Sequence, residues 1–233
     1  MYRWIAAAGA LASAIVLSSH ASAEPYFWGL QAEQLEYRTD GDDDILAWDF
    51  DAFFGRDELQ FVWRSEAEYD VGADVFETLE NQARLQTPIS DFFDAVAGIR
   101  VDTPAGPDRV YGVLGLHGLA PQWFEIDADL FISDAPFFRF EAEYEGLITN
   151  RVILTPSVEL DVPLTDDEDI ERGAWAPKLE AGARLSYDLI DRAFAPYIGV
   201  HYERLFGESG RLARAEGEDR DQVLFVVGAR VMF

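Results

Sequence analysis

The carboxy-terminal twelve residues, 222–233, alternate between apolar and mixed side chains. They read QVLFVVGARVMF, with an apolar residue at every second position: Val223, Phe225, Val227, Ala229, Val231 and Phe233. A period of two is that of a β-strand, because successive side chains of a strand point to opposite faces. We therefore expect a final strand with one wholly apolar face.

The same alternation runs through about twelve segments from residue 28 onward. In 46–54, for example, Trp48 lies on the apolar face while Asp49 and Asp51 share the other. An α-helix has a period of 3.6 residues and would scatter these faces. The period slips near Gln34 in the first segment, and the glycine-rich sixth segment leaves its facing open. The expected strands are 28–38, 45–54, 59–69, 75–87, 95–102, 110–118, 123–133, 137–145, 151–161, 177–188, 195–204 and 222–233.

The connections alternate between short turns and a set that contains the two longest loops, 162–176 and 205–221. An even number of strands then places both termini on the side of the short turns, as in bacterial outer-membrane barrels. Such a barrel pairs its last strand with its first, because open strand edges in lipid leave N–H and C=O groups unsatisfied. The expected fold is all-β, a transmembrane, antiparallel up-and-down β-barrel of about twelve strands.

The last strand also resembles the assembly signal of bacterial outer-membrane β-barrel proteins, because it alternates and ends in an aromatic residue. That signal would comprise Phe225, Val227, Ala229, Val231 and Phe233.

Residues 1–23 have the features of a secretory signal peptide. Arg3 gives a basic start, 5–17 is an apolar run too short to span a membrane, and Ala21-Ser22-Ala23 fits a small-x-small cleavage site. Cleavage after Ala23 would leave a single barrel domain, 24–233. The alternative, a retained anchor helix, fits the length of the run less well.

Alternation does not by itself say which face looks into the barrel. A soluble barrel would bury the apolar set and expose the charges, whereas a membrane barrel does the reverse. The export signal, the terminal Phe233 and aromatic residues near the strand ends favour the membrane barrel. We expect these aromatic residues to form interfacial girdles: Trp28, Tyr37, Phe54, Tyr69, Trp123, Phe124, Tyr144, Tyr187 and Tyr197.

The charged faces would then line the lumen. Acids and arginines mixed in one lumen predict an ion-pair network that ties strands together. The acids outnumber the arginines, so the surplus could attract metal cations or form a cation-selective path. The expected lumen residues are Asp49, Asp51, Arg64, Glu66, Glu68, Glu80, Arg84, Arg100, Asp102, Glu125, Asp127, Asp129, Arg139, Glu141, Glu143, Arg151, Glu159, Glu180, Arg184, Glu203 and Arg230.

The amino-acid composition excludes some kinds of bond and of binding partner. The chain has no Cys, which excludes disulfides and thiolate metal sites. Its formal net charge of -26 argues against nucleic acid as a partner, since nucleic-acid-binding surfaces are basic. The acidic balance suits cations, or simply a well-solvated surface.

Several segments resemble the copper resistance protein B family of outer-membrane proteins. They are WGLQAEQLEYR (28–38), LAWDFDAFFG (46–55), LGLHGLAPQWFEIDADLFIS (114–133), FRFEAEYE (138–145), LEAGARLSYD (179–188), FAPYIGVHYERLFG (194–207) and ARAEGED (213–219). The resemblance covers most of residues 26–233 and keeps the family's order. It implies copper resistance, copper ion binding and copper homeostasis at the Gram-negative cell outer membrane. The implied partners are membrane lipid, the outer-membrane assembly machinery and periplasmic copper-handling proteins.

The chain departs from that family in its potential copper ligands. Many members carry a Met- and His-rich segment before the barrel, and thioethers and imidazoles suit copper. Here only residues 24–27 separate the predicted cleavage site from the first expected strand. The mature chain would hold one Met, Met232, and two His, His117 and His201. A copper site could join the two imidazoles across the lumen, but a role as polar lining residues is the simpler interpretation.

Two carboxylate pairs on adjacent expected strands are further metal candidates. Asp49 with Asp51, and Glu66 with Glu68, project to one face and could hold a hard cation. Pairing of these carboxylates with the nearby arginines, Arg64 and Arg84, is the alternative that we favour.

Two other functional classes remain open. A narrow channel for small solutes or cations would use the same barrel, although a crowded, charged lumen disfavours general solutes. A lipid hydrolase or acyltransferase would need a Ser–His pair near the outer leaflet. Ser133 and Ser209 are the serines considered, and no nucleophile motif surrounds either, so we do not expect an enzyme.

Overall fold

The computed structural model describes residues 25–41, 44–104, 108–167, 170, 172–190, 192–216 and 219–233. The predicted signal peptide, residues 1–23, and its cleavage site after Ala23 lie outside these ranges. Within the described ranges, no helix has the length and apolar character needed to cross a membrane.

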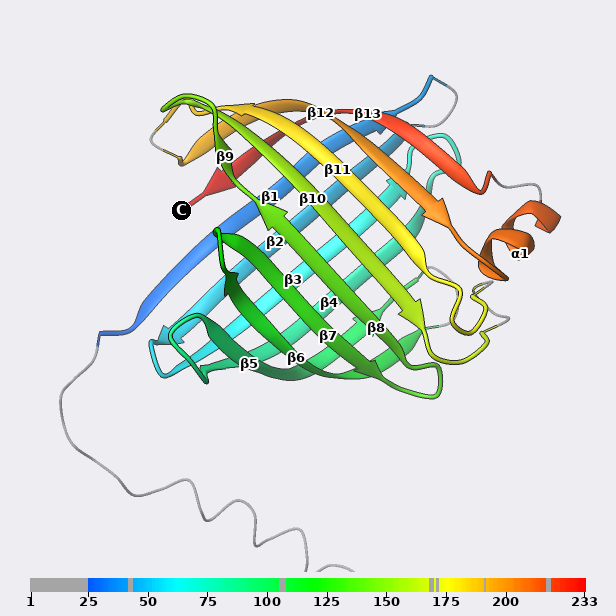
Figure 1. Ribbon diagram of the computed structural model, residues 1–233, viewed down its shortest axis with the longest axis horizontal. Coiled ribbons are helices and arrows are strands. Elements are labelled where there is room, and N and C mark those ends of the chain that lie inside the picture. Colours follow the sequence, from blue (N-terminus) through cyan, green and yellow to red (C-terminus); the bar gives the residue numbers. More distant parts are fainter. Residues whose placement is uncertain are drawn as a thin grey trace, which may run out of the picture.

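The described chain forms one closed β-barrel (Figure 1). Each strand runs antiparallel to its neighbours, and β13 pairs with β1 to close the sheet. The short β9 continues the line of β8 against β10, so twelve strands make up the wall. The predicted antiparallel barrel is therefore confirmed. The strands are β1 Phe27–Thr39, β2 Asp44–Arg56, β3 Leu59–Asp70, β4 Val75–Pro88, β5 Phe93–Asp102, β6 Arg109–Ala120, β7 Phe124–Ile132, β8 Phe137–Tyr144, β9 Gly146–Leu147, β10 Val152–Pro163, β11 Lys178–Tyr187, β12 Phe194–Leu205 and β13 Asp221–Met232.

The two ends of the barrel differ in their connections. We call the end where β1 begins and β13 finishes the proximal end, and the opposite end the distal end (Figure 1). The two longest connections, 164–177 and 206–220, lie at the distal end, as the strand order predicts. The second of them contains a helix that the sequence pattern did not indicate, α1 Ser209–Glu216.

A β-bulge interrupts β1. Ala32 pairs with Phe50 and Gln34 pairs with Asp49, so β1 carries one more residue than β2 over this stretch. Consecutive side chains at Glu33 and Gln34 both line the lumen. The bulge accounts for the slip of period that the sequence shows near Gln34.

The outward face of the barrel is apolar. In β13, Phe225 and Val227 are 66% and 61% exposed, whereas Val226 between them is 1% exposed. This is the facing expected for the last strand, with its apolar set outward. Large apolar side chains are exposed all around the barrel wall, which gives the continuous hydrophobic surface that lipid requires.

Most of the expected girdle residues lie on this outer face, but Tyr197 does not. Trp28, Phe54 and Trp123 are well exposed, while Tyr197 is buried inside the barrel. Tyr197 lies directly opposite Gly228, where an added Cβ would come within 2.7 Å of the tyrosine ring. The missing side chain at Gly228 creates the space into which Tyr197 turns, so its assignment to the girdle was wrong.

An aromatic cluster fills the distal part of the lumen. Tyr111, Phe131 and Phe137 contact one another with ring centroids 4.5–6.2 Å apart. The guanidinium carbon of Arg100 lies 4.7 Å from the centre of the Phe131 ring, within the range of a cation–π contact. Tyr111 also shows how the glycine-rich sixth strand faces, because alternate residues from this position point inward.

Candidate metal centre in the lumen

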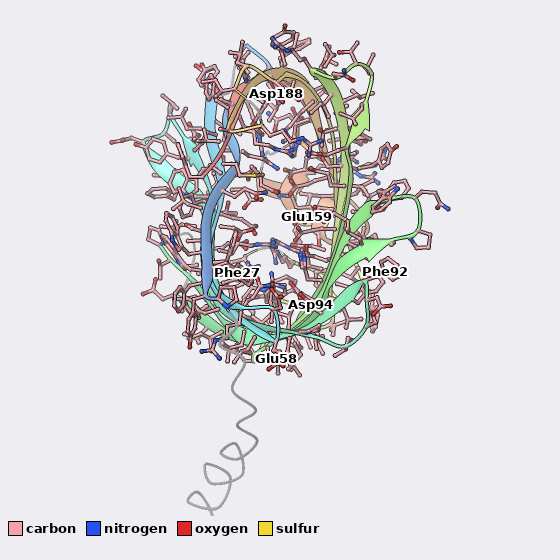
Figure 2. All side chains as sticks on the ribbon, turned by 90° about the vertical axis from the view of Figure 1, so that its left-hand side faces the viewer. Phe27, Glu58, Phe92, Asp94, Glu159 and Asp188 are labelled. Atoms are coloured by element: carbon pink, nitrogen blue, oxygen red, sulfur yellow. The ribbon has the colours of Figure 1, made fainter. Side chains whose placement is uncertain are left out.

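The lumen contains a cavity of about 340 Å³ with a strongly acidic lining. Among its described lining residues, thirteen are Asp or Glu and six are Arg or Lys. Figure 2 looks into the oval ring of strands from the proximal end, with Glu159 among the side chains on the inner wall. The charged strand faces predicted a surplus of carboxylates inside the barrel. In the structure these carboxylates line the cavity.

Arginines bridge the lumen from one wall to another. Arg139 of β8 pairs with Glu66 of β3 at 3.0 Å and with Glu80 of β4 at 3.3 Å. Arg84 of β4 pairs with Asp129 of β7 at 2.8 Å. The predicted ion-pair network is confirmed. Its bridges divide the interior, so the lumen is not one wide aqueous channel.

One expected lumen residue is misplaced by the sequence pattern. Arg151 lies in the exposed turn 148–151, ahead of β10. The Thr149 hydroxyl accepts hydrogen bonds from the backbone N–H groups of Arg151 and Val152 and holds this turn outside the strand. The other expected lumen residues line the cavity or belong to the ion-pair network.

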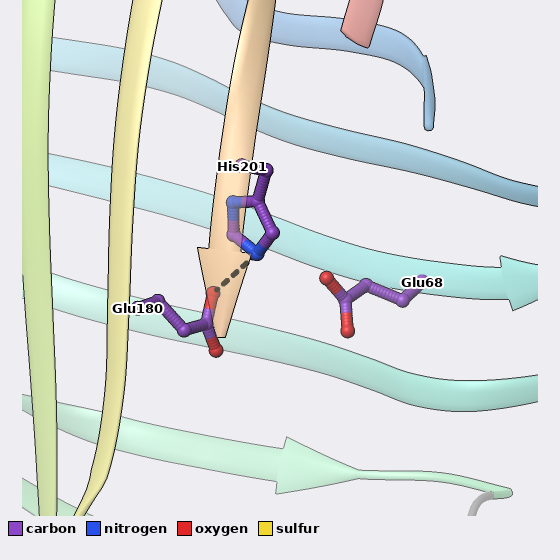
Figure 3. Close-up of side chains that lie close together, drawn as sticks. All are labelled: Glu68, Glu180 and His201. Atoms are coloured by element: carbon purple, nitrogen blue, oxygen red, sulfur yellow. Dashed lines mark ion pairs between the residues drawn. The ribbon is translucent and has the colours of Figure 1, made fainter. Parts of the chain in front are cut away.

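Three side chains meet in a group that we call the lumen triad: Glu68 of β3, Glu180 of β11 and His201 of β12 (Figure 3). One potential ligand atom from each lies within 4.8 Å of the others. His201 Nε2 is 3.5 Å from Glu180. In the strand register, His201 of β12 is the partner of Gly182 on β11.

The imidazole nitrogen that faces the two carboxylates is buried and makes no hydrogen bond to the described residues, although it lies within ion-pair distance of Glu180. His201 is 5% exposed, and its Nε2 has no hydrogen-bond partner among the described residues. A buried polar atom without a partner is costly and uncommon, so it calls for an explanation such as an ion. One imidazole nitrogen with two carboxylate oxygens is a donor set that divalent transition metals accept.

The two histidines of the barrel belong to different clusters. His117 Nδ1 lies 3.1 Å from Asp127, and its Nε2 lies 4.0 Å from Glu125. The lumen triad contains His201 but not His117. The possible site joining both imidazoles across the lumen is therefore not formed.

The carboxylate pairs considered from the sequence are divided among several partners. Asp51 pairs with Arg64 at 3.2 Å, as favoured, while Glu66 lies 3.9 Å from Arg64 and 3.0 Å from Arg139. Asp49 keeps one buried oxygen without a hydrogen-bond partner among the described residues. Only Glu68 joins a group with metal-ligand spacing.

Arg84 was expected beside these carboxylates and lies elsewhere. It pairs with Asp127 and Asp129, because its strand faces β7 across the lumen. Sequence spacing gives the face of a residue but not the partner that the curvature of the barrel brings to it.

Comparison with known proteins decides the family. A family model described as copper resistance protein B precursor (CopB) matches residues 26–233. The chain belongs to the copper resistance protein B family. Copper resistance protein B of Escherichia coli is 36% identical over 203 residues, which cover 86% of this chain and 68% of that protein. A copper resistance protein B homolog of Pseudomonas syringae pv. tomato is 36% identical over 204 residues, which cover 87% of this chain and 68% of the homolog.

A solved NanC porin has a similar fold. Its TM-score is 0.55 at 12% sequence identity, and the match covers 88% of this chain and 99% of that chain. At this identity the likeness concerns the fold alone. Membership of the copper resistance protein B family, together with the barrel, places the chain in the outer membrane and implies a role in copper resistance. Both features point to a non-enzymatic role.

Ser209, which was considered as a catalytic serine, stabilises the loops of this copper resistance family member. Ser209 is buried, its hydroxyl accepts a hydrogen bond from Gly173 N at 3.0 Å, and it donates to Ala176 O at 3.1 Å. These bonds connect the two distal loops. The other serine, Ser133, accepts a hydrogen bond from the backbone of Ala135 in a turn.

Some residues that shape the metal centre were not singled out from the sequence. Glu36 and Arg38 lie beyond the bulge of β1, where the broken period hid their inward facing. Lys178 lies at the start of β11, as the expected strand 177–188 places it, and pairs with Glu180 at 3.0 Å. For Lys178, the charge alternation with Glu180 was the only available signal.

Proposed function

We propose that this protein binds divalent copper inside the barrel, at the lumen triad, and thereby sequesters copper or helps to export it. The observation that carries the proposal is the buried Nε2 of His201, which faces Glu68 and Glu180 and makes no hydrogen bond to the described residues. Copper is here the cargo of the protein. The family gives the role in copper resistance, and the triad supplies a place for the ion.

The donor set favours Cu(II) over Cu(I). Imidazole and carboxylate ligands suit the divalent ion, whereas Cu(I) prefers thioether and thiolate sulfur. The chain has no Cys and only two Met, Met1 and Met232. The imidazole binds as the neutral base, so copper binding should weaken as the pH falls and protons compete for His201.

A narrow cation channel is the second candidate function. The acidic cavity supports it, and the ion pairs that bridge the lumen disfavour passage of uncharged solutes. Flux of potassium ions through liposomes that contain the barrel separates the two. We expect no potassium flux; rapid flux would favour the cation channel.

Calorimetric titration of the refolded barrel with Cu(II) tests the binding proposal. We expect one saturable site in the wild type and its loss in His201→Gln, which removes the imidazole donor. His117→Gln is the matched control and should bind like the wild type. Electron paramagnetic resonance of the copper-loaded barrel should show one coordinated imidazole nitrogen. Absence of saturable binding at micromolar copper, or unchanged binding in His201→Gln, would overturn the proposed site.

The cellular role can be measured separately. Loss of the gene should lower copper tolerance, and complementation with His201→Gln should restore it less well than the wild type. We further propose that the outer-membrane assembly machinery recognises the last strand and that periplasmic copper-handling proteins exchange copper with the barrel. Unchanged growth of the deletion strain across a copper series would contradict the role.

A further inference from the structure

Both carboxylates of the lumen triad already have cationic partners. Arg38 pairs with Glu68, and Lys178 pairs with Glu180 at 3.0 Å. Lys178 also lies 3.1 Å from Glu203. An incoming metal ion therefore meets carboxylates whose negative charge is largely cancelled.

The triad is part of a larger ion-paired group with a small net charge. This described group contains three cations and four carboxylates: Arg38, Arg184, Lys178, Glu36, Glu68, Glu180 and Glu203. Its formal net charge is -1, whereas the carboxylates without the cations would carry -4. The side chains are mostly buried, so salt screens these charges less than it would at the surface.

The small net charge of this group affects the binding of hard cations and of copper differently. Calcium and magnesium bind through oxygen ligands, and their affinity depends on how many charged ligands a site offers. Copper gains affinity from the imidazole nitrogen, which is neutral and is not consumed by Arg38 or Lys178. Cancelling the carboxylate charge thus removes most of the attraction for Ca²⁺ and Mg²⁺ but leaves the nitrogen donor of His201 in place.

We infer that Arg38 and Lys178 are specificity-determining residues of the lumen triad. By pairing with Glu68 and Glu180, they exclude hard divalent cations and leave His201 to select copper. This inference rests on the proposed copper binding and adds the means by which the site discriminates. Removing one of the two cations should convert a copper-selective site into one that also accepts calcium.

Lys178→Leu tests the inference, because Leu removes the charge and adds no metal-binding atom. We expect the affinity of the barrel for Ca²⁺, measured by calorimetry, to rise at least tenfold in Lys178→Leu, with a smaller rise for Cu(II). Lys178→Arg keeps the charge and should behave like the wild type. The double variant Lys178→Leu with His201→Gln should bind Ca²⁺ but lose Cu(II).

A measurement on the wild-type barrel does not depend on how well the variants fold. Millimolar Ca²⁺ or Mg²⁺ should leave the copper isotherm of the wild type unchanged. Competition at these concentrations, unchanged Ca²⁺ affinity in Lys178→Leu, or an equal rise for both metals would overturn the inference. Failure of the wild type to bind copper would instead remove the proposed function, whatever the Ca²⁺ affinity of Lys178→Leu.

Discussion

Glu36 joins strands on both sides of the β13–β1 junction from inside the lumen. Its buried carboxylate accepts hydrogen bonds from Arg38 Nε at 2.6 Å, from Arg184 Nε and Nη2 at 2.8 Å each, and from the Tyr197 hydroxyl at 2.8 Å. These partners stand on β1, β11 and β12. We predict that Glu36→Gln lowers the free energy of unfolding of the barrel by about 3–5 kcal/mol.

The magnitude follows from the hydrogen bonds of Glu36. The carboxylate accepts four bonds, three of them from guanidinium groups. A glutamine amide oxygen has two lone pairs and can replace about two of them. At least two charge-assisted bonds are lost, each contributing roughly 1.5–3 kcal/mol. Breaking a buried ion pair by removing one partner costs about 3–5 kcal/mol, so the two estimates agree.

Denaturant unfolding of the barrel in lipid vesicles, followed by tryptophan fluorescence, measures this change. The matched control is Glu58→Gln in the exposed turn between β2 and β3, which should alter the free energy of unfolding by no more than about 0.5 kcal/mol. A loss below about 1 kcal/mol for Glu36→Gln, or one equal to that of the control, would refute the proposed role of this carboxylate.

Two further predictions concern the same junction. Gly228→Ala should destabilise the barrel by about 1–3 kcal/mol in the same unfolding assay. The new Cβ would lie 2.7 Å from both the Tyr197 ring and the Leu35 carbonyl oxygen. Wild-type stability of the variant would contradict this prediction. Deleting Phe233 should reduce the fraction of chain assembled in the outer membrane, since Phe233 exchanges two backbone hydrogen bonds with Leu30. Phe233→Tyr keeps these bonds and should assemble normally, while normal assembly of the truncated chain would refute the expectation.

The strands could be predicted because their charges and apolar residues alternate without ambiguity. Asp127 and Asp129, for example, fix the inward face of β7, and the neighbouring Ala128 and Leu130 fix its outward face. The girdle position of Tyr197 could not be judged in this way, because an aromatic ring suits either face. Its facing depends on the space above Gly228, which lies on another strand.

The metal centre was only partly predictable for a related reason. His201 was a candidate because imidazoles are scarce in the chain, and Glu68 because it forms a carboxylate pair with Glu66. Their meeting with Glu180 depends on the closure and tilt of the barrel, since the three residues stand on β3, β11 and β12. Alternation gives the face of each residue but not its height in the lumen.

The bulge in β1 has a consequence for how this strand tolerates changes in length. In a regular strand, removal of one residue moves every later side chain to the opposite face. In β1, Glu33 is the extra residue, and Glu33 and Gln34 both face inward. Removing Glu33 would restore a regular strand in which Glu36 and Arg38 still point into the lumen. A one-residue deletion in a regular strand inverts the facing of every later residue. Deletion of the bulge residue Glu33 would instead leave the lipid face and the lumen face of β1 as they are.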